Sequence, residues 1–140
     1  MASRSLDELN PGFRVRVDAW LKACDGAGLV ILPTCTYRNA LEQEALYAIG
    51  RTVKGEGASW WKPMGDIVTR ARPFQSAHQY RMAIDFVPLN CGKPDWSGNS
   101  ALWDSAIDLA EANNLESLRP MESAHVQLPN WRDFAGAPAP

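Results

Sequence analysis

The sequence has few of the residues that usually bind metals or form cross-links. Only two of its 140 residues are histidine and three are cysteine. The cysteines, Cys24, Cys35 and Cys91, are odd in number and form no C-x-x-C motif. This pattern favours free thiols in a reducing compartment over a single disulfide.

Long apolar runs and clusters of one charge are also missing. The net charge is −2, and lysine and arginine are scattered along the chain. A nucleic-acid-binding face needs a basic patch, so we expect no nucleic-acid partner. No run is long enough to span a membrane, and residues 1–7 contain no apolar signal region. We therefore expect a protein made in the cytosol, without stable membrane insertion.

The composition that is present predicts one folded domain. Hydrophobic residues make up 46% of the chain, which is enough for a core of its own. We predict a single domain over residues 1–134 and a disordered, low-complexity tail over residues 135–140. We expect a monomer without repeats or a separate wall-binding module.

Three helices are expected from capping residues and apolar periodicity. The first helix begins at Asn10-Pro11 and ends at Gly26. The second begins with a capping box formed by Asn39 and Glu42, and the third has Ser100 as its N-cap. The predicted buried stripes are Phe13, Val17, Trp20, Leu21 and Cys24, then Leu41, Ala45, Ala48 and Ile49, then Trp103, Ala106, Ile107 and Ala110.

Short strands are predicted between these helices. They cover residues 29–33 leading into 34–37, then 66–70, 83–87 and 124–128. Residues 88–98 and 115–121 are expected to be connections. The fold class is therefore α+β, a small antiparallel sheet with helices packed at one face and a site on its open side.

Both histidines lie in segments that could build a metal site. Alternation places Ile84 and Phe86 on one face of the strand 83–87 and Asp85 on the other. A buried carboxylate is costly unless it is paired, and a metal would pair it. The chain must turn at residues 79–81 to bring His78 to the same side. We interpret His78, Asp85 and His125 as three ligands of a divalent metal such as zinc, with a fourth position for water.

Other interpretations of these residues are weighed beside this one. A lone histidine is usually structural, but two in matching contexts favour ligation. A structural zinc site would need a fourth protein ligand, which only Glu122 or Cys91 could supply. Cys91 is set aside because its loop leads away from the strand. Glu122, three residues before His125, could be a fourth ligand, a surface acid or a general base.

The motif Ser76-x-His78, six residues, then Asp85, with a later Glu122-x-x-His125, resembles a peptidase family. The family is that of the zinc D-alanyl-D-alanine carboxypeptidases and phage endolysin L-alanyl-D-glutamate peptidases, which have the hedgehog-type fold. Residues 36–52, with Tyr-Arg, Gln and a closing Gly-Arg-Thr, are similar to the endolysin branch. The resemblance covers residues 29–128. Arg81 stands where the family usually has glycine.

The resemblance implies roles for further residues. Glu122 would be the general base, and Arg38 would stabilise the oxyanion, although an arginine in this position is commonly a surface ion-pair partner. Gln43 and Ser76 would bind substrate; the alternatives are a helix-surface glutamine and a serine that supports the surroundings of His78. Apart from the resemblance, Trp60 and Trp61 lie in a long loop and could stack on sugar rings, line the peptide groove or cover the core.

The implied activity is zinc-dependent hydrolysis of the peptidoglycan stem peptide, at the L-Ala–D-Glu bond. The implied setting is a phage endolysin, made in the host cytoplasm and acting on the periplasmic cell wall of a Gram-negative host after release. Two alternatives remain: a D,D-carboxypeptidase that trims terminal D-Ala, and a non-catalytic zinc-containing binding module.

Overall fold

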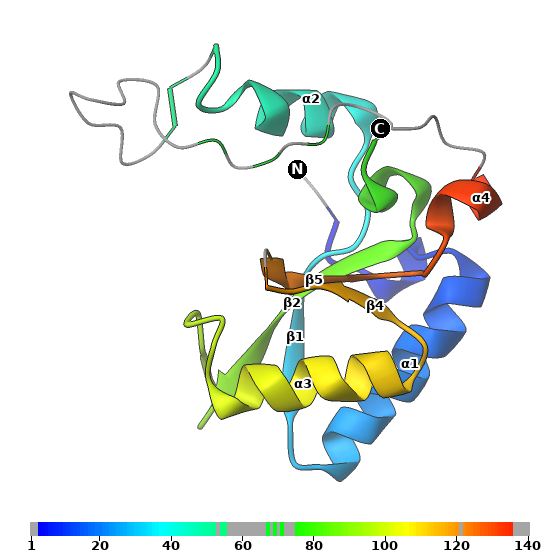
Figure 1. Ribbon diagram of the computed structural model, residues 1–140, viewed down its shortest axis with the longest axis vertical. Coiled ribbons are helices and arrows are strands. Elements are labelled where there is room, and N and C mark those ends of the chain that lie inside the picture. Colours follow the sequence, from blue (N-terminus) through cyan, green and yellow to red (C-terminus); the bar gives the residue numbers. More distant parts are fainter. Residues whose placement is uncertain are drawn as a thin grey trace.

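A computed structural model describes residues 3–52, 54–55, 67, 69, 71, 75–120 and 122–135. It is an α+β fold, as predicted, with an antiparallel sheet in the order β1-β2-β5-β4 and a short β3 paired to β2 (Figure 1). The helical elements are η1 (Leu6–Glu8), α1 (Pro11–Gly26), α2 (Ala40–Ala48), η2 (Ala77–Tyr80), α3 (Ala101–Ala112) and α4 (Trp131–Ala135). The strands are β1 (Val30–Cys35), β2 (Ala83–Asn90), β3 (Lys93–Pro94), β4 (Glu116–Leu118) and β5 (Glu122–Gln127).

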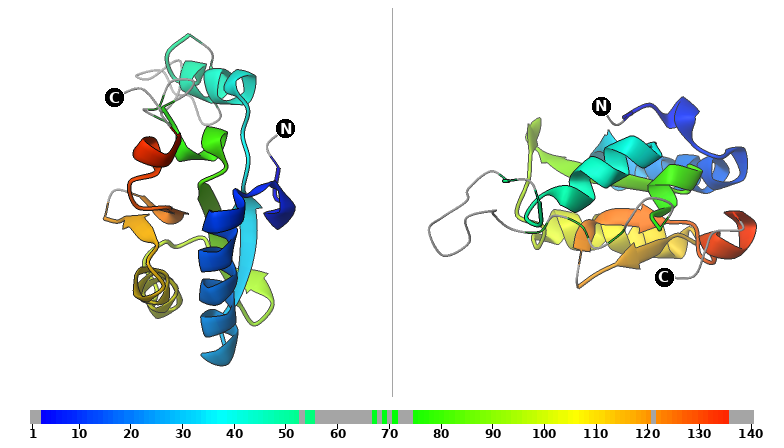
Figure 2. Two further views of the ribbon diagram at one scale, coloured as in Figure 1. Left: turned by 90° about the vertical axis from the view of Figure 1, so that its right-hand side faces the viewer. Right: turned by 90° about the horizontal axis from the view of Figure 1, so that it is seen from above.

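The core lies between one face of the sheet and the helices α1 and α3 (Figure 2). Phe86 of β2 packs between Trp20 of α1 and Trp103 of α3, with ring centroids 5.0 and 5.2 Å away. Both indole N–H groups are satisfied by main-chain oxygens, those of Ala106 and Asp95. Large aromatic rings in such contact dominate core energetics. The predicted stripes of the first and third helices are confirmed, with Leu21 only partly buried.

The predicted stripe of the second helix is wrong. Leu41 is 76% exposed and Ala45 is exposed, whereas Gln43 is fully buried. The capping box at Asn39 and Glu42 is present as predicted. The cause is position: α2 lies at the far end of the molecule from α3, away from the aromatic core (Figure 1). Its inner side meets the polar main chain near residue 71, which a glutamine amide can satisfy.

Two predicted connections contain strands. β2 runs on to Asn90 and forms a hairpin with β3 through Cys91 and Gly92, both at positive φ. β4 lies within residues 115–121, where three residues are too few to show alternation. Ser100 is the N-cap of α3, but its hydroxyl donates to Asp95 rather than accepting from the helix.

Some predictions lie partly or wholly outside the described residues. Trp60 and Trp61 are outside them, and of the predicted strand 66–70 only residues 67 and 69 are described, neither of them in a strand. Residue 135 ends α4 rather than beginning a tail, and residues 136–140 are not described. Within the described chain, no helix is both long and apolar enough to cross a membrane.

Candidate metal centre and active site

The pairing of β2 with β5 positions the carboxylate and one imidazole. Asp85 lies directly opposite His125 in the register of these two strands, on the face away from Phe86. Directly opposed side chains on one face are neighbours in an antiparallel pair. Asp85 Oδ1 is 3.1 Å from His125 Nδ1 as a result.

The second imidazole reaches the same oxygen through a tight turn. Ser76 caps η2 by accepting from the main-chain N–H of His78, and Arg81 ends the turn at φ 65°. The predicted turn between His78 and Asp85 is therefore confirmed, and His78 Nε2 is 3.0 Å from Asp85 Oδ1. A φ of this sign normally favours glycine. The Arg81 side chain turns away from the site, over the ring of Tyr37 and onto Glu8.

The separations between these donor atoms suit a small divalent ion. Ligand atoms about 2.0–2.1 Å from a tetrahedral zinc lie about 3.4 Å from one another, close to the 3.0 and 3.1 Å measured from Asp85 Oδ1 to the two histidine nitrogens. Among the described residues, two sets of three donors lie within 4.8 Å of one another, and they share Asp85: Cys35–His78–Asp85 and Asp85–Glu122–His125. The donors thus fit a metal centred on Asp85.

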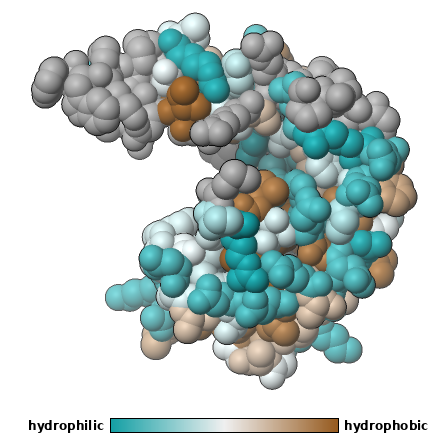
Figure 3. All heavy atoms as spheres, in the orientation of Figure 1, coloured by the Kyte–Doolittle hydropathy of each residue, from teal (hydrophilic) through white to brown (hydrophobic). Residues whose placement is uncertain are grey.

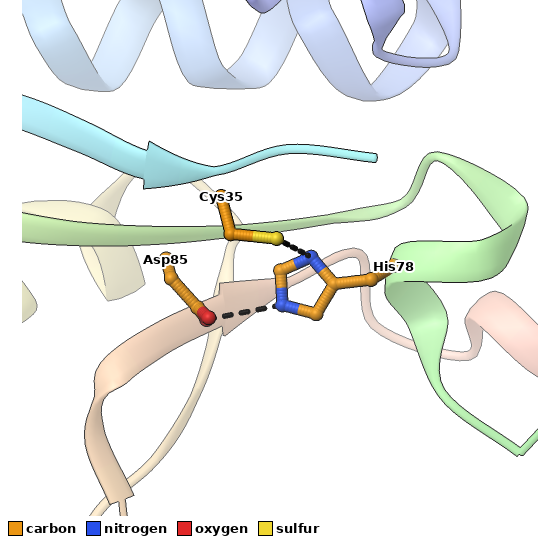
Figure 4. A group of neighbouring side chains, drawn as sticks. All are labelled: Cys35, His78 and Asp85. Carbon is orange, nitrogen blue, oxygen red and sulfur yellow. Dashed lines mark hydrogen bonds and ion pairs between the residues drawn. The ribbon is translucent and has the colours of Figure 1, made fainter. Parts of the chain in front are cut away.

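Cys35 lies beside His78 but on the other side of its ring. The Cys35 sulfur is 3.7 Å from His78 Nδ1, whereas Asp85 meets Nε2 (Figure 4). The main-chain oxygen of Thr36 is also 3.2 Å from Nδ1. When His78 is neutral, as a metal ligand must be, donation from Nδ1 to Thr36 leaves the Nε2 lone pair facing Asp85.

The charges of the two groups are coupled. Burial alone would lower the pKa of His78, but the hydrogen bond and charge of Asp85 raise it to about 10. Burial would raise the pKa of Asp85, but hydrogen bonds from His125 and His78 hold it well below its usual range. The carboxylate is therefore ionised, as a metal ligand must be, and a bound cation would replace the proton of His78.

Glu122 begins β5 and is exposed. A carboxylate oxygen of Glu122 lies within 4.8 Å of donor atoms of both Asp85 and His125. It is thus near enough to act as a further ligand or to contact a water beside the ion. Glu122 therefore lies at the surface but directly beside the donor set.

Arg38 enters the site from the end of β1. Its guanidinium is 3.8 Å from Asp85 Oδ2 and donates to Gln43 Oε1 at 2.8 Å. The side chain is only 12% exposed, and its Nε has no hydrogen-bond partner among the described residues. A buried donor without a partner is costly. Arg38 is therefore a largely buried cation beside Asp85 and not a surface ion-pair residue.

Gln43 lies behind Arg38, fully buried, with both ends of its amide bonded inside the protein. Its Nε2 donates to the main-chain oxygen of Ala71 at 2.5 Å. The alternative of a helix-surface glutamine is therefore wrong. Of the two interpretations of Ser76, the structure shows the one in which it supports the surroundings of His78.

Comparisons with known proteins agree with this geometry. The chain is 32% identical over 124 residues to the peptidoglycan L-alanyl-D-glutamate endopeptidase CwlK of Bacillus subtilis (strain 168), covering 89% of this chain and 65% of that protein. It spans, in other words, just under two thirds of the length of that relative. No family model matches the sequence.

Solved structures show the same fold. The Serratia marcescens L-Ala D-Glu endopeptidase ChiX superposes with a TM-score of 0.63 at 14% identity, covering 96% of this chain and 92% of that one. This chain therefore shares the fold of that structure. The LD-carboxypeptidase LdcB also gives a TM-score of 0.63, at 17% identity, covering 86% of this chain and 58% of that one. The fold that the sequence resemblance implied is confirmed.

Among the three donor side chains, Asp85 is the most exposed to solvent. Figure 3 shows a hollow between the arm that carries α2 and the body of the molecule. Both imidazoles are nearly enclosed, with exposed fractions of 2% and 8%, whereas Asp85 retains 19%. A ligand would therefore reach the centre along the carboxylate side rather than past the rings.

The sequence analysis missed three residues that support the histidines. Cys35 and Thr36 flank His78 Nδ1, and Gln127 Oε1 is 2.8 Å from His125 Nε2. A signal for Gln127 existed, because it follows His125 by two residues and so shares its face of the strand. Cys35 and the carbonyl of Thr36 gave none, since their position depends on how β1 pairs with β2.

Proposed function

We propose that this chain is a zinc-dependent peptidase that hydrolyses the L-Ala–D-Glu bond in the stem peptide of bacterial peptidoglycan. The observation that carries the proposal is the meeting of two imidazole nitrogens at Asp85 Oδ1, with Glu122 beside them. The similarity to the Bacillus subtilis endopeptidase supports the choice of bond.

Zinc would be held by His78 through Nε2, His125 through Nδ1 and Asp85 through its carboxylate. Imidazole suits zinc better than it suits magnesium or calcium, which prefer oxygen ligands. When bound, zinc would lower the pKa of a water molecule and polarise the carbonyl of the scissile peptide. Three protein ligands leave a position for substrate, as in catalytic rather than structural sites.

Glu122 would act as the general base and then as the acid. Its carboxylate takes a proton from the attacking water as the new C–O bond forms. It returns that proton to the leaving nitrogen as the C–N bond breaks, so that the products are a carboxylic acid and an amine, which then ionise to a carboxylate and an ammonium group. General acid–base catalysis of this kind contributes about 10²–10⁴-fold in rate.

Arg38 would bind the carbonyl oxygen of the scissile peptide. Its guanidinium lies 3.8 Å from Asp85 Oδ2, so its N–H groups and positive charge would stabilise that oxygen as negative charge develops on it. Gln43 and Ser76 would serve the substrate indirectly, Gln43 by holding the guanidinium of Arg38 and Ser76 by holding the turn at His78.

A phage endolysin is the biological role that we propose. The support is the similarity of residues 36–52 to the endolysin branch and the match of the motif around His78, Asp85 and His125. In that role the monomeric chain is made in the host cytoplasm and acts on the periplasmic wall of a Gram-negative host after release. Lysis of outer-membrane-permeabilised cells by the purified protein tests this part.

The chemical proposal is tested with a defined stem pentapeptide, L-Ala-D-Glu-diaminopimelate-D-Ala-D-Ala, and metal analysis of the same sample. We expect one zinc per chain and products of free L-Ala and a peptide that begins with D-Glu, with both zinc and products lost in His78→Ala. Release of D-Ala instead would identify a carboxypeptidase. Bound zinc without any hydrolysis would indicate a binding module, and absence of zinc would overturn the proposal.

A further inference from the structure

A chain of side-chain hydrogen bonds connects His125 to strand β4. His125 Nε2 is 2.8 Å from Gln127 Oε1, and Gln127 Nε2 donates to Glu116 Oε1 at 2.7 Å. Gln127 shares the strand face of His125, and Glu116 lies directly opposite Gln127 in the β4–β5 register. The sheet itself therefore brings the three side chains together.

The chemistry of Glu116 gives this chain a direction. An ionised carboxylate can only accept hydrogen bonds, so the amide of Gln127 must turn its NH₂ group to Glu116 and its oxygen to His125. An amide oxygen also only accepts, so Nε2 of His125 must carry the hydrogen. In a neutral imidazole this leaves the lone pair on Nδ1, which is the nitrogen that faces Asp85.

We propose that Glu116 and Gln127 are positioning residues that select the tautomer of His125 able to bind metal through Nδ1. The inference rests on the proposed function, because it takes zinc as the ion. A neutral His78 would have the opposite tautomer, because the main-chain oxygen of Thr36 can only accept a hydrogen bond from Nδ1. A main-chain acceptor cannot be removed by substitution, whereas the two side chains behind His125 can be changed one at a time.

The decisive variant is Glu116→Lys. An ammonium only donates, so it attracts the oxygen of Gln127 and turns the NH₂ group toward His125 Nε2. That arrangement favours hydrogen on Nδ1, the tautomer that cannot bind metal through this nitrogen. Partners behind a ligating histidine are worth about 10–100-fold in metal affinity, so we expect zinc to bind weaker by that factor.

Glu116→Gln is the matched control. An amide at position 116 can still offer an oxygen to Gln127, so zinc affinity should stay close to that of the wild type. The charge introduced by lysine is separated by repeating Glu116→Lys in a Gln127→Ala background, where no amide remains to turn. In that background, the loss of zinc affinity caused by Glu116→Lys should be smaller and should reflect only the added positive charge.

Two readouts other than activity report the result. The first is the zinc dissociation constant from competition with a chromophoric chelator. The second is the imidazole ¹⁵N spectrum of the zinc-loaded protein, which is simple because the chain contains only two histidines. The wild type should show one ring bound through Nδ1 and the other through Nε2. The melting temperatures of the metal-free variants show whether a substitution weakens zinc binding only by destabilising the fold.

The outcomes separate this inference from the proposed function. Weaker zinc binding in Glu116→Lys but not in Glu116→Gln, with an altered His125 ring spectrum, supports tautomer selection. Equal affinities and unchanged ring spectra in a wild type that binds zinc would overturn it and leave the peptidase proposal standing. A wild type that binds no zinc overturns both.

Discussion

The two histidines reach one carboxylate oxygen from differently built halves of the molecule. His78 is 2% exposed and is held by main-chain groups, the carbonyl of Thr36 and the turn of η2. His125 is held by the side chains of Gln127 and Glu116, next to the exposed Glu122. The position of His78 is thus fixed by the fold, whereas the orientation of His125 is set by side chains that substitution can change. We call the surroundings of His78 the fixed half and those of His125 the adjustable half.

Removing either imidazole should give the largest effect. Both His78→Ala and His125→Ala should lose zinc and peptide hydrolysis, because two remaining protein donors hold zinc poorly. The two variants should differ in stability. His78→Ala opens space at a more buried position and leaves the main-chain oxygen of Thr36 without its donor. We expect its melting temperature, measured without metal, to fall further than that of His125→Ala. A larger fall for His125→Ala would break the comparison.

Glu122→Gln should separate chemistry from metal binding in the adjustable half. The amide cannot take a proton from water, so the rate should fall by about 10²–10⁴-fold. Zinc content should remain near one per chain, since the two histidines and Asp85 are intact. Hydrolysis rates on the stem peptide and metal analysis check both parts. Loss of zinc in this variant would mean that Glu122 is a ligand instead of the base.

Gln43→Ala tests the fixed half beyond the metal. Its loss frees the guanidinium of Arg38, and a single hydrogen bond is worth about 1 kcal/mol, roughly fivefold in rate. Arg38→Ala removes the oxyanion donor itself and should cost about 10²–10³-fold. In the Arg38→Ala background, Gln43→Ala should have little further effect on the hydrolysis rate. Additive losses would show that Gln43 acts independently of Arg38.

The metal-free protein should show the coupling of His78 and Asp85 in its pH dependence. The pKa of His78 is raised from 6.5 to about 10, so its contribution is complete below 6.5 and is lost as the pH rises toward 10. The pKa of Asp85 is lowered from 3.8, so its contribution is lost as the pH falls below that value. The free energy of unfolding of the metal-free protein, measured in denaturant across this pH range, should therefore be highest near pH 4–6.5. A His78→Ala control should lack the alkaline decline.

The smallest effect is expected at Arg81. Arg81→Gly removes the strain of a positive φ, about 1 kcal/mol, but also loses the side-chain contacts with Glu8 and Tyr37. These two effects on the free energy of unfolding should nearly cancel. Arg81→Ala keeps the strained φ and loses the same contacts, so it should be the less stable variant. The free energy of unfolding in urea distinguishes them. Equal stabilities would show that the turn at His78 does not depend on this residue.

The sequence was enough to predict that His78, Asp85 and His125 come together, but not which residues support them. His78, Asp85 and His125 could be found because rare residue types recur in a matching motif, and strand alternation set the face of Asp85. The buried stripe of α2 was mispredicted because periodicity shows which residues could pack, not whether an apolar partner lies opposite. The role of Gln127 depends on the register with Glu116, and β4 is too short to be visible in sequence.

The strand order also bears on when the centre can assemble during synthesis. His78 and Asp85 are only seven residues apart and can meet early, but His125 lies on β5, forty residues after its partner on β2. A growing chain that has not yet made β5 holds two of the three donors and lacks Glu122. The site is therefore completed only when β5, the last strand of the sheet, pairs with β2. All three donors and Glu122 come together only at the end of folding.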